Sequence, residues 1–443
     1  MILLEGVVSR VRFRHGRREY VVTDGKLEHE VRSDESMPQG ACVSIEGEAA
    51  VGAIIAKKTA VLEGEADKKA FARVRENVRA SAAFSDLPRL ISDDITRKMW
   101  PSLRGAALEI LLAKKAGRSV MLRFHGDADG ISGAFAITSV LSCKAFQQNS
   151  AIYSVKDALR DMAAIGQESR PMVLLVDFGS ADACAEGLAL LAAAGIDYLV
   201  IDHHPYNAKG NARIVNPYAI GENASGYTAG YLACEIAAAC GLDAEKAGEL
   251  ARVGCAGDKS GLFGSGPEDA EAAMVLDFLA SHVSFGNNLD FYKKVMENRE
   301  LFSSIARQAD ESIAEAAAKA EARMRKSEAG GVLVAVFSLE GIVKKGEWPS
   351  SSKVTTRVFD RLRAAAPEKP LMCVGHTEKM LIMRLNDAAV EMGLSANGIA
   401  EKLKKSMADF IEGGGGHDRA GAIRAKKGFV KDVLGQLLAE AGA

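Results

Sequence analysis

The sequence lacks the features that mark secreted, zinc-ribbon and membrane proteins. Its seven cysteines include no CxxC pair and have no regular spacing, which argues against a zinc ribbon and a disulfide framework and fits a reducing compartment. No apolar run is long enough to span a membrane. The stretch 1–13 carries charge within its apolar part and has no signal-peptide cleavage pattern. These absences predict a soluble, cytoplasmic protein with no membrane partner.

A strong net charge is also absent, as are internal repeats and low-complexity tracts. The formal net charge is −2, so a nucleic-acid partner would have to bind local basic patches rather than a general positive field. The function therefore has to be sought in local motifs.

The N-terminal part of the chain has the pattern of a small β-barrel. With 443 residues and a hydrophobic fraction of 48%, the chain is expected to fold into two to four domains. Residues 1–60 alternate apolar and polar side chains, which predicts about five short strands closing into a barrel of the OB type. Residues 61–118 are charged and rich in Ala and Leu, which predicts helices that join the barrel to the next domain.

The rest of the chain predicts two α/β regions. Residues 119–290 contain apolar runs of strand length that alternate with helical segments, which is typical of a parallel sheet covered on both faces. Residues 291–328 lie within a helical pattern free of Gly and Pro, so one connecting helix is expected. Residues 329–443 predict a second, smaller α/β domain that contains the glycine run 413–416. The fold class is therefore α/β with an N-terminal barrel.

Two adjacent histidines are the most informative feature. His203 and His204 follow Asp202 at the end of an apolar strand, where packing does not explain them. Three further acidic motifs are interpreted as strand ends: HGDADG at 125–130, VDF at 176–178 and GD at 257–258. Ligands of open α/β sheets bind at the carboxyl ends of the strands, so these groups are expected to meet there.

The motifs supply a set of ligands that suits divalent metal ions. If 125–129 is extended, its alternating polar side chains point the same way, Gly126 and Gly130 allow tight turns, and Ser132 caps the next helix. A lone acid at a strand end is usually a helix cap, but four such motifs in one domain favour a metal site. The mostly carboxylate set favours Mn²⁺ or Mg²⁺, and the imidazoles favour Mn²⁺. The candidate ligands are His125, Asp127, Asp129, Asp177, His203 and Asp258.

Taken in chain order, HGDADG, VDF, DHH and GD resemble the four motifs of the DHH phosphoesterase superfamily. GGGGHDRAGA at 413–422 resembles the GGGH motif of its companion DHHA1 domain. The resemblance covers about 119–443 and is closest to archaeal-type RecJ-like exonucleases, some of which carry an added barrel. It implies that His125, Asp127 and Asp177 hold one metal, that Asp129, Asp177, His203 and Asp258 hold the other, that His204 faces the scissile phosphate, and that Asp202 orients a histidine.

The resemblance also implies a substrate-binding set in the second α/β domain. Arg384 would bind backbone phosphate, His417 would reach a phosphate, and the amides of Gly414, Gly415 and Gly416 would approach it closely. Asp418 and Arg419 depart from the common pattern, in which small residues or Pro are frequent. Ser225, beside Gly226, either binds substrate near the metals or only caps a helix.

The barrel region carries a basic and aromatic strand. Arg12, Arg14, Arg17 and Arg18 alternate with Phe13 and Tyr20, a pattern that suits single-stranded nucleic acid but equally fits a solvated edge strand with one core aromatic residue.

The leading hypothesis is a two-metal exonuclease, specific for single strands of DNA, RNA or both, that releases 5′-mononucleotides. A second is a phosphodiesterase for oligoribonucleotides or cyclic dinucleotides, and a third is a replication component with an active nuclease site. A pyrophosphatase of family II type fits least. The expected cofactor is two Mn²⁺ ions, with Mg²⁺ as the alternative. The expected partners are single-stranded nucleic acid and replication or repair proteins.

Overall fold

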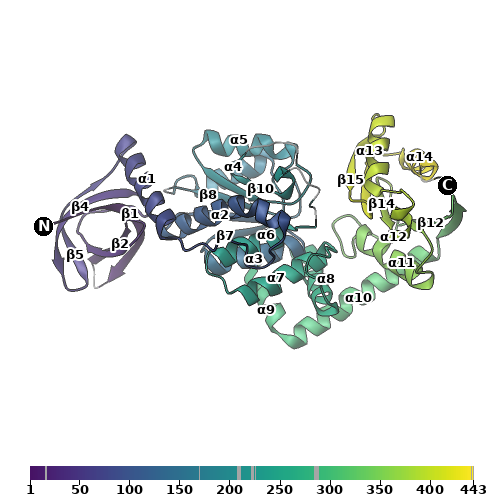
Figure 1. The fold of residues 1–443 in the computed structure, drawn as a ribbon, viewed down its shortest axis with the longest axis horizontal. Coiled ribbons are helices and arrows are strands. Elements are labelled where there is room, and N and C mark those ends of the chain that lie inside the picture. The colour runs from purple at the N-terminus through teal and green to yellow at the C-terminus, as the bar shows by residue number, and fades with distance from the viewer. Residues whose placement is uncertain are drawn as a thin grey trace. The chain divides into compact units, whose positions relative to one another are not determined.

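The computed structural model describes residues 1–14, 17–168, 170–206, 211–220, 224, 226–283, 289–440 and 442. The chain divides into two compact units (Figure 1). Unit 1 comprises Met1–Asp277 and Phe285–Val295, and unit 2 comprises Phe278–Ser284 and Met296–Ala443. No helix in the described residues combines the length and apolar character needed to cross a bilayer.

The N-terminal segment of unit 1 is a closed five-stranded barrel, as predicted (Figure 1). Its strands pair in the order β1-β2-β3-β5-β4, and β3 runs parallel to β5 while the other pairs are antiparallel. The barrel closes because alternate apolar side chains, among them Val8, Val22 and Ile45, are fully buried inside it. The strands are β1 (Ile2–Arg14), β2 (Arg17–Thr23), β3 (Glu28–Arg32), β4 (Cys42–Ala50) and β5 (Ala53–Val61).

Two helices follow the barrel, as the sequence predicts. Helix α1 spans Gly64–Ser81 and α2 spans Asp94–Lys115. Helix α2 begins with a capping box, in which the Asp93 carboxylate accepts from the Thr96 amide and the Thr96 hydroxyl accepts from the Asp93 amide. Arg170, from the loop before β8, donates to the carbonyl of Gly40 in the barrel and stacks on Phe71 of α1. This arginine therefore ties the barrel and α1 to the sheet domain.

The second part of unit 1 is a parallel five-stranded sheet, which confirms the predicted fold class. The strand order is β10-β9-β8-β6-β7, and every pair is parallel. The strands are β6 (Val120–His125), β7 (Lys144–Gln148), β8 (Met172–Val176), β9 (Asp197–Ile201) and β10 (Ile214–Val215). Strands β6, β8 and β9 read as apolar runs because helices cover both faces of the sheet, whereas the edge strand β7 does not.

The covering helices divide between the two faces of this sheet (Figure 1). Helices α4 (Val155–Ile165) and α5 (Ala185–Ala193) pack on one face. Helices α3 (Ala128–Val140), α6 (Ala229–Ala239) and α7 (Ala244–Gly257) pack together on the other. Two short 3₁₀ turns, Asp182–Cys184 and Pro217–Ile220, lie in the connections.

The order of the strands determines where the site lies. The chain passes from β6 to β7 on one side and then returns to add β8 on the other side of β6. Loops that leave β6 and β8 therefore diverge, which opens a crevice at the carboxyl ends of these strands. His125 ends β6 and Asp177 directly follows β8, so both lie at this switch point.

The prediction of one connecting helix over 291–328 is wrong. The structure has α8 (Pro267–His282), α9 (Leu289–Glu297) and α10 (Arg299–Glu321), followed by strand β11 (Arg325–Ala329). The break between α9 and α10 falls at Asn298, whose side chain caps α10 by accepting from the amide of Leu301. A capping asparagine stops one helix and starts the next without Gly or Pro.

Unit 2 contains a mixed six-stranded sheet in the order β11-β12-β13-β14-β16-β15, in which only β12 and β13 run parallel. Its core lies between this sheet and helices α13 and α14, and a second cluster lies against α10 and α11. The strands are β12 (Val332–Ser338), β13 (Leu371–His376), β14 (Met380–Leu385), β15 (Ile411–Gly416) and β16 (Ala420–Ala425), and the helices are α11 (Ser351–Ala365), α12 (Asp387–Glu391), α13 (Ala396–Ser406) and α14 (Val430–Glu440).

Candidate metal centre

The motif HGDADG at 125–130 spans the end of strand β6 and the start of helix α3, so its polar side chains lie on two different backbone conformations. His125 is the last residue of the strand, Asp127 is the N-cap of α3, and Asp129 lies in the first turn of that helix. The predicted extended geometry is therefore wrong for Asp129. Ser132 does not cap the helix either: it is buried within α3, and the cap is Asp127, which accepts from the amide of Gly130.

Asp129 lies between two glycines that the sequence analysis did not identify. A β-carbon at Gly230 or Gly254 would come within 2.6 or 2.7 Å of Asp129 Oδ1. The amide of Gly230 donates to this oxygen at 3.1 Å. Any larger residue would displace the carboxylate, so both glycines fix the position of Asp129.

Asp177 and Asp258 reach the site from unusual positions in the chain. Asp177 follows β8 with φ of 68°, in the left-handed region that non-glycine residues seldom adopt. Asp258 is the C-terminal cap of α7, so the prediction that GD ends a strand is wrong. A helix end and a strand end deliver their side chains to the same crevice.

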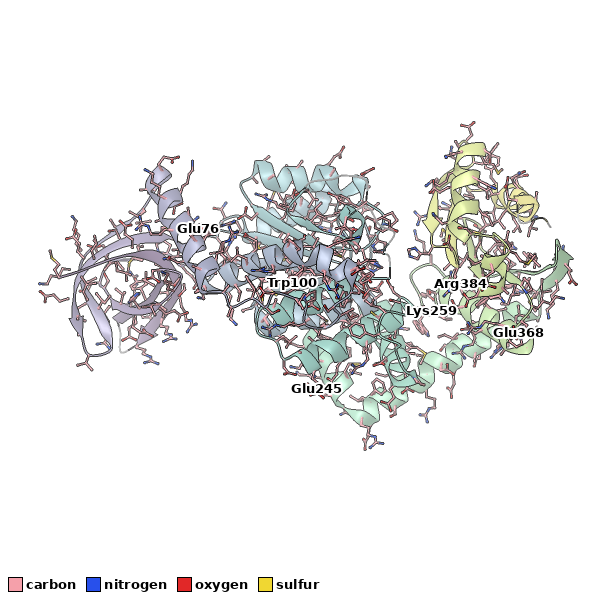
Figure 2. All side chains as sticks on the ribbon, viewed as in Figure 1. Glu76, Trp100, Glu245, Lys259, Glu368 and Arg384 are labelled. Carbon is pink, nitrogen blue, oxygen red and sulfur yellow. The ribbon has the colours of Figure 1, made fainter. Side chains whose placement is uncertain are left out.

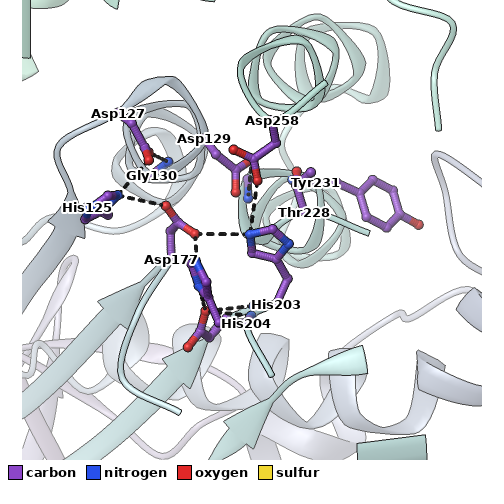
Figure 3. Close-up of polar contacts among 12 residues, drawn as sticks. His125, Asp127, Asp129, Gly130, Asp177, His203, His204, Thr228, Tyr231 and Asp258 are labelled. Atoms are coloured by element: carbon purple, nitrogen blue, oxygen red, sulfur yellow. Dashed lines mark hydrogen bonds and ion pairs between the residues drawn. The ribbon is translucent and has the colours of Figure 1, made fainter. Parts of the chain in front are cut away.

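All six predicted ligands meet at this crevice (Figure 3). His125 Nδ1 lies 2.6 Å from Asp127 Oδ2 and 3.3 Å from Asp177 Oδ2. His203 Nε2 lies 3.1 Å from Asp258 Oδ2 and 3.5 Å from Asp177 Oδ1. In each of three groups, potential ligand atoms lie within 4.8 Å of one another: His125, Asp127 and Asp177; Asp177, His203 and His204; and Asp129, His203 and Asp258. Asp177 and His203 each belong to two of these groups.

A buried hydrogen-bond network fixes the two histidines. Asp202 Oδ1 accepts from the amides of His203 and His204 and contacts His204 Nδ1 at 2.8 Å. Its other oxygen accepts from the amide and hydroxyl of Ser180. The Asn216 side chain donates to Ser180 Oγ and to the carbonyl of His204. Because Nδ1 of His204 is engaged, its Nε2 is the atom that remains for other contacts.

Ser180 and Asn216 were not identified from the sequence. Asn216 directly follows β10, and a polar residue at the carboxyl end of a buried strand is the same signal that pointed to Asp177. Asp277 of α8 is a third such residue, because its carboxylate accepts from the amide of Ala128 beside Asp127 and Asp129. No local pattern in the sequence points to Asp277.

The charges of the site are strongly coupled. Burial and the neighbouring carboxylate of Asp127 raise the pKa of Asp177 to about 7. Burial and the carboxylates of Asp177 and Asp258 raise the pKa of Asp129 well above its usual range. Burial would also raise the pKa of Asp127, but the adjacent His125 lowers it below its ordinary value. The site therefore holds more negative charge than its buried surroundings favour.

The neighbouring carboxylates raise the pKa values of the three histidines of the site, whereas burial lowers them. Burial lowers the pKa of His204, but the hydrogen bond and charge of Asp202 outweigh it and raise the value to about 9. For His125 and His203, burial is likewise outweighed by the adjacent carboxylates, so both pKa values rise well above the ordinary one.

Two carboxylate oxygens show that the site fits cations. Within the part of the chain that the structure describes, Asp129 Oδ2 and Asp177 Oδ1 are buried and have no hydrogen-bond donor. Buried carboxylate oxygens are otherwise paired, because desolvation without a partner is costly. A divalent cation would coordinate such oxygens and offset the repulsion among the carboxylates, so the donor set suits hard metal ions.

The predicted substrate-binding residues lie in unit 2. Arg384 (Figure 2) is on β14, and its guanidinium donates to Ser352 and Thr356 of α11 and to the carbonyl of Met383. Gly414, Gly415 and Gly416 lie on β15, which is an edge strand, so alternate amides face away from the sheet. His417 follows in the exposed turn to β16.

Other predicted details have mixed outcomes. Arg419, which departs from the common pattern, forms an exposed ion pair with Asp387. Ser225 lies outside the described residues, and the N-cap of the next helix, α6, is Thr228. The structure therefore does not test the role of Ser225.

The basic strand of the barrel is less available than its sequence indicates. Arg12 pairs with Glu30 and Arg14 with Glu19. Tyr20 is fully buried in the barrel core, so it is no stacking surface, whereas Phe13 is exposed with Arg18 over its ring. The side chain of Arg17 is not described.

Residues 119–255 match the family described as DHH family, N-terminal domain. This match identifies residues 119–255 as a DHH-family domain, and solved structures with a RecJ-like fold superpose on the chain. A solved DHH-domain structure, described as coming from a member of a family of ribosomal proteins, superposes with a TM-score of 0.74 at 22% identity, over 85% of this chain and 99% of that one. RecJ from Thermus thermophilus in complex with Mn²⁺ superposes with a TM-score of 0.51 at 16% identity, over 77% of this chain and 54% of that one.

A curated relative has no assigned function. It is an uncharacterised protein of Methanocaldococcus jannaschii, 23% identical over an alignment of 448 positions that covers 85% of this chain. This chain spans 58% of the length of that relative.

Proposed function

We propose that the protein is a divalent-metal-dependent phosphodiesterase that degrades single-stranded DNA or RNA from one end and releases 5′-mononucleotides. The observation that carries the proposal is the set of overlapping three-residue groups, two of which share Asp177, with buried carboxylate oxygens that lack donors. Two cations, of which Mn²⁺ is the better match to a mixed imidazole and carboxylate set, would occupy the two groups. Bound there, they would activate a water for in-line attack and neutralise charge on the phosphate.

The protein's own residues would hold and orient the reacting groups. His125, Asp127 and Asp177 would hold one ion, and Asp129, Asp177, His203 and Asp258 would hold the other, with Asp177 as a ligand common to both. Asp202 keeps His204 oriented through Nδ1, and its charge favours the protonated imidazole. Protonated His204 would then present Nε2–H to a phosphoryl or leaving oxygen.

Unit 2 is proposed to bind the strand away from the reacting phosphate. Arg384 is held by two hydroxyl groups and one carbonyl, so it presents a fixed positive charge rather than a mobile one. The outward amides of the glycine strand and the exposed His417 would add neutral donors to phosphate oxygens.

Oligomers of single-stranded DNA and RNA, labelled at either the 5′ or the 3′ end, test the proposal directly. The purified protein should release a labelled mononucleotide from one end in Mn²⁺, and Asp127→Ala should release none. Intact long oligomers, with cleavage only of two- to five-nucleotide substrates, would instead identify a small-substrate phosphodiesterase. Hydrolysis by Asp127→Ala at the normal rate would contradict the metal assignment.

A role in the replication machinery remains compatible with this proposal. All the predicted ligands are present and gathered at one crevice, which favours an active site over a purely scaffolding role. Replication or repair proteins are therefore proposed as additional partners of an active enzyme.

A further inference from the structure

One end of the β15–β16 hairpin in unit 2 carries exposed aromatic and basic side chains. On β16, Ile423 and Ala425 are buried against α13 and α14, whereas Arg424 between them is exposed. The ladder extends one step beyond the strands, because the amide of Lys426 donates to the carbonyl of Phe410 at 2.8 Å. Arg424, Lys426 and Phe410 therefore belong to the face of the hairpin that turns away from this core.

Two phenylalanines stack on each other at this end of the hairpin. Phe410 is 36% exposed and Phe429 is 38% exposed, and their ring centroids lie 4.7 Å apart. Phe429 is brought back toward Phe410 by a tight turn, in which its amide donates to the carbonyl of Lys426. Neighbouring aromatic rings that keep a third of their surface in water mark a binding surface rather than a core.

Several cations at this end of the hairpin form no ion pair. Lys379 lies beside the hairpin, because its carbonyl accepts from the amide of Ala425, and Lys427 follows Lys426. Among the residues that the structure describes, neither Lys379, Arg424, Lys426 nor Lys427 forms an ion pair.

We propose that this surface, formed by Lys379, Phe410, Arg424, Lys426, Lys427 and Phe429, binds single-stranded nucleic acid by stacking bases on the two rings and holding phosphates with the cations. Exposed rings among unpaired cations match the two chemical parts of a single strand, a π-face on every base and a charge on every phosphate. The surface lies at the opposite end of β15 and β16 from His417, so it is separate from the glycine strand's turn. The proposal rests on the proposed function only in its choice of partner.

Binding of the full chain to a fluorescent oligothymidylate and an oligouridylate of about 16 nucleotides, measured by anisotropy in EDTA, tests the proposal without hydrolysis. The double variant Phe410→Leu and Phe429→Leu keeps apolar side chains but removes the aromatic faces, so affinity should fall about tenfold. An oligomer with abasic positions should lose affinity for the wild type by a similar factor and should bind the leucine variant no more weakly than the normal oligomer does.

The salt dependence of binding tests the cations separately. Arg424→Gln with Lys426→Gln should reduce the slope of log affinity against log salt by about 1.4, because each phosphate contact on a single strand contributes about 0.7. Lys319→Gln with Lys326→Gln is the matched control: it removes two exposed charges elsewhere in unit 2 and should leave the slope unchanged.

The outcomes separate this proposal from the nuclease proposal. Undiminished binding by the leucine variant, or equal affinity for the abasic oligomer, would overturn it and would indicate a general polyanion site such as an acidic protein partner would use. Hydrolysis of a chromogenic nucleotide ester in Mn²⁺ should be the same in all these variants. A wild type that hydrolyses no ester but binds oligomers through these residues would refute the nuclease and support the binding surface.

Discussion

Replacing Asp177 by Asn should stabilise metal-free unit 1 while removing its response to metal. Asp177 is 2% exposed and lies among other carboxylates, so its charged form is unfavourable until a cation binds. Asparagine has nearly the same shape, carries no charge, and tolerates the φ of 68° at this position better than alanine does. The variant therefore isolates the charge from the backbone.

The magnitude follows from the pKa of the group. The pKa of Asp177 is raised from 3.8 to about 7, a difference that corresponds to about 4 kcal/mol. Because the pKa is higher in the folded state, this stability is present below about pH 4 and is lost as the pH rises through about 7. At about pH 8 the asparagine variant should thus be more stable than the wild type by up to about 4 kcal/mol, and near pH 4 the two should be alike.

Urea unfolding followed by the fluorescence of Trp100 measures this stability in unit 1 alone. Trp100 lies on α2 of unit 1 (Figure 2) and is 5% exposed, and the only other tryptophan is Trp348, so a Trp348→Phe background leaves one reporter. Saturating Mn²⁺ at about a hundred times its dissociation constant should stabilise the wild type by about 2.7 kcal/mol and the asparagine variant by much less.

Two results would refute this reasoning. If the asparagine variant is no more stable than the wild type in EDTA at about pH 8, the charge at Asp177 is not held unfavourably. If Mn²⁺ stabilises both proteins equally, Asp177 is not a ligand. Asp86→Asn, at an exposed position of unit 1, is the control for removing a carboxylate as such, and it should change neither quantity.

Three further changes have definite expected results. In Asp202→Asn, the pKa of His204 should fall from about 9 toward 6.5, so the basic limb of the profile of kcat against pH should move down; an unshifted limb would mean that His204 is not the titrating acid. Glu235→Ala removes the buried acceptor of the amides of Arg89 and Leu90 and should destabilise unit 1 by about 2–3 kcal/mol in urea unfolding, with an effect below about 0.5 kcal/mol counting against that account. Deletion of residues 1–60 should raise KM for long strands and leave KM for dinucleotides unchanged. An equal rise in KM for both substrates would show that the barrel does not act through strand binding.

The sequence by itself predicted the barrel, the parallel sheet and the set of ligands, because each depends on a local pattern. Alternation of apolar residues predicts strands whatever the rest of the chain does, and a polar group after a buried strand must emerge at the sheet edge. His125, Asp177 and His203 were found in this way, and the structure brings them together.

Only the tertiary structure decided how the remaining groups reach the crevice and what supports them. Asp258 comes from a helix end and Asp129 from a first helical turn, so no strand rule could place them. Ser180 and Asp277 act on the site across 22 and 149 residues of sequence, and a hydrogen bond between distant segments leaves no local pattern. The elevated pKa of Asp177 is likewise a property of packing, since it arises from burial among carboxylates that the fold alone brings close.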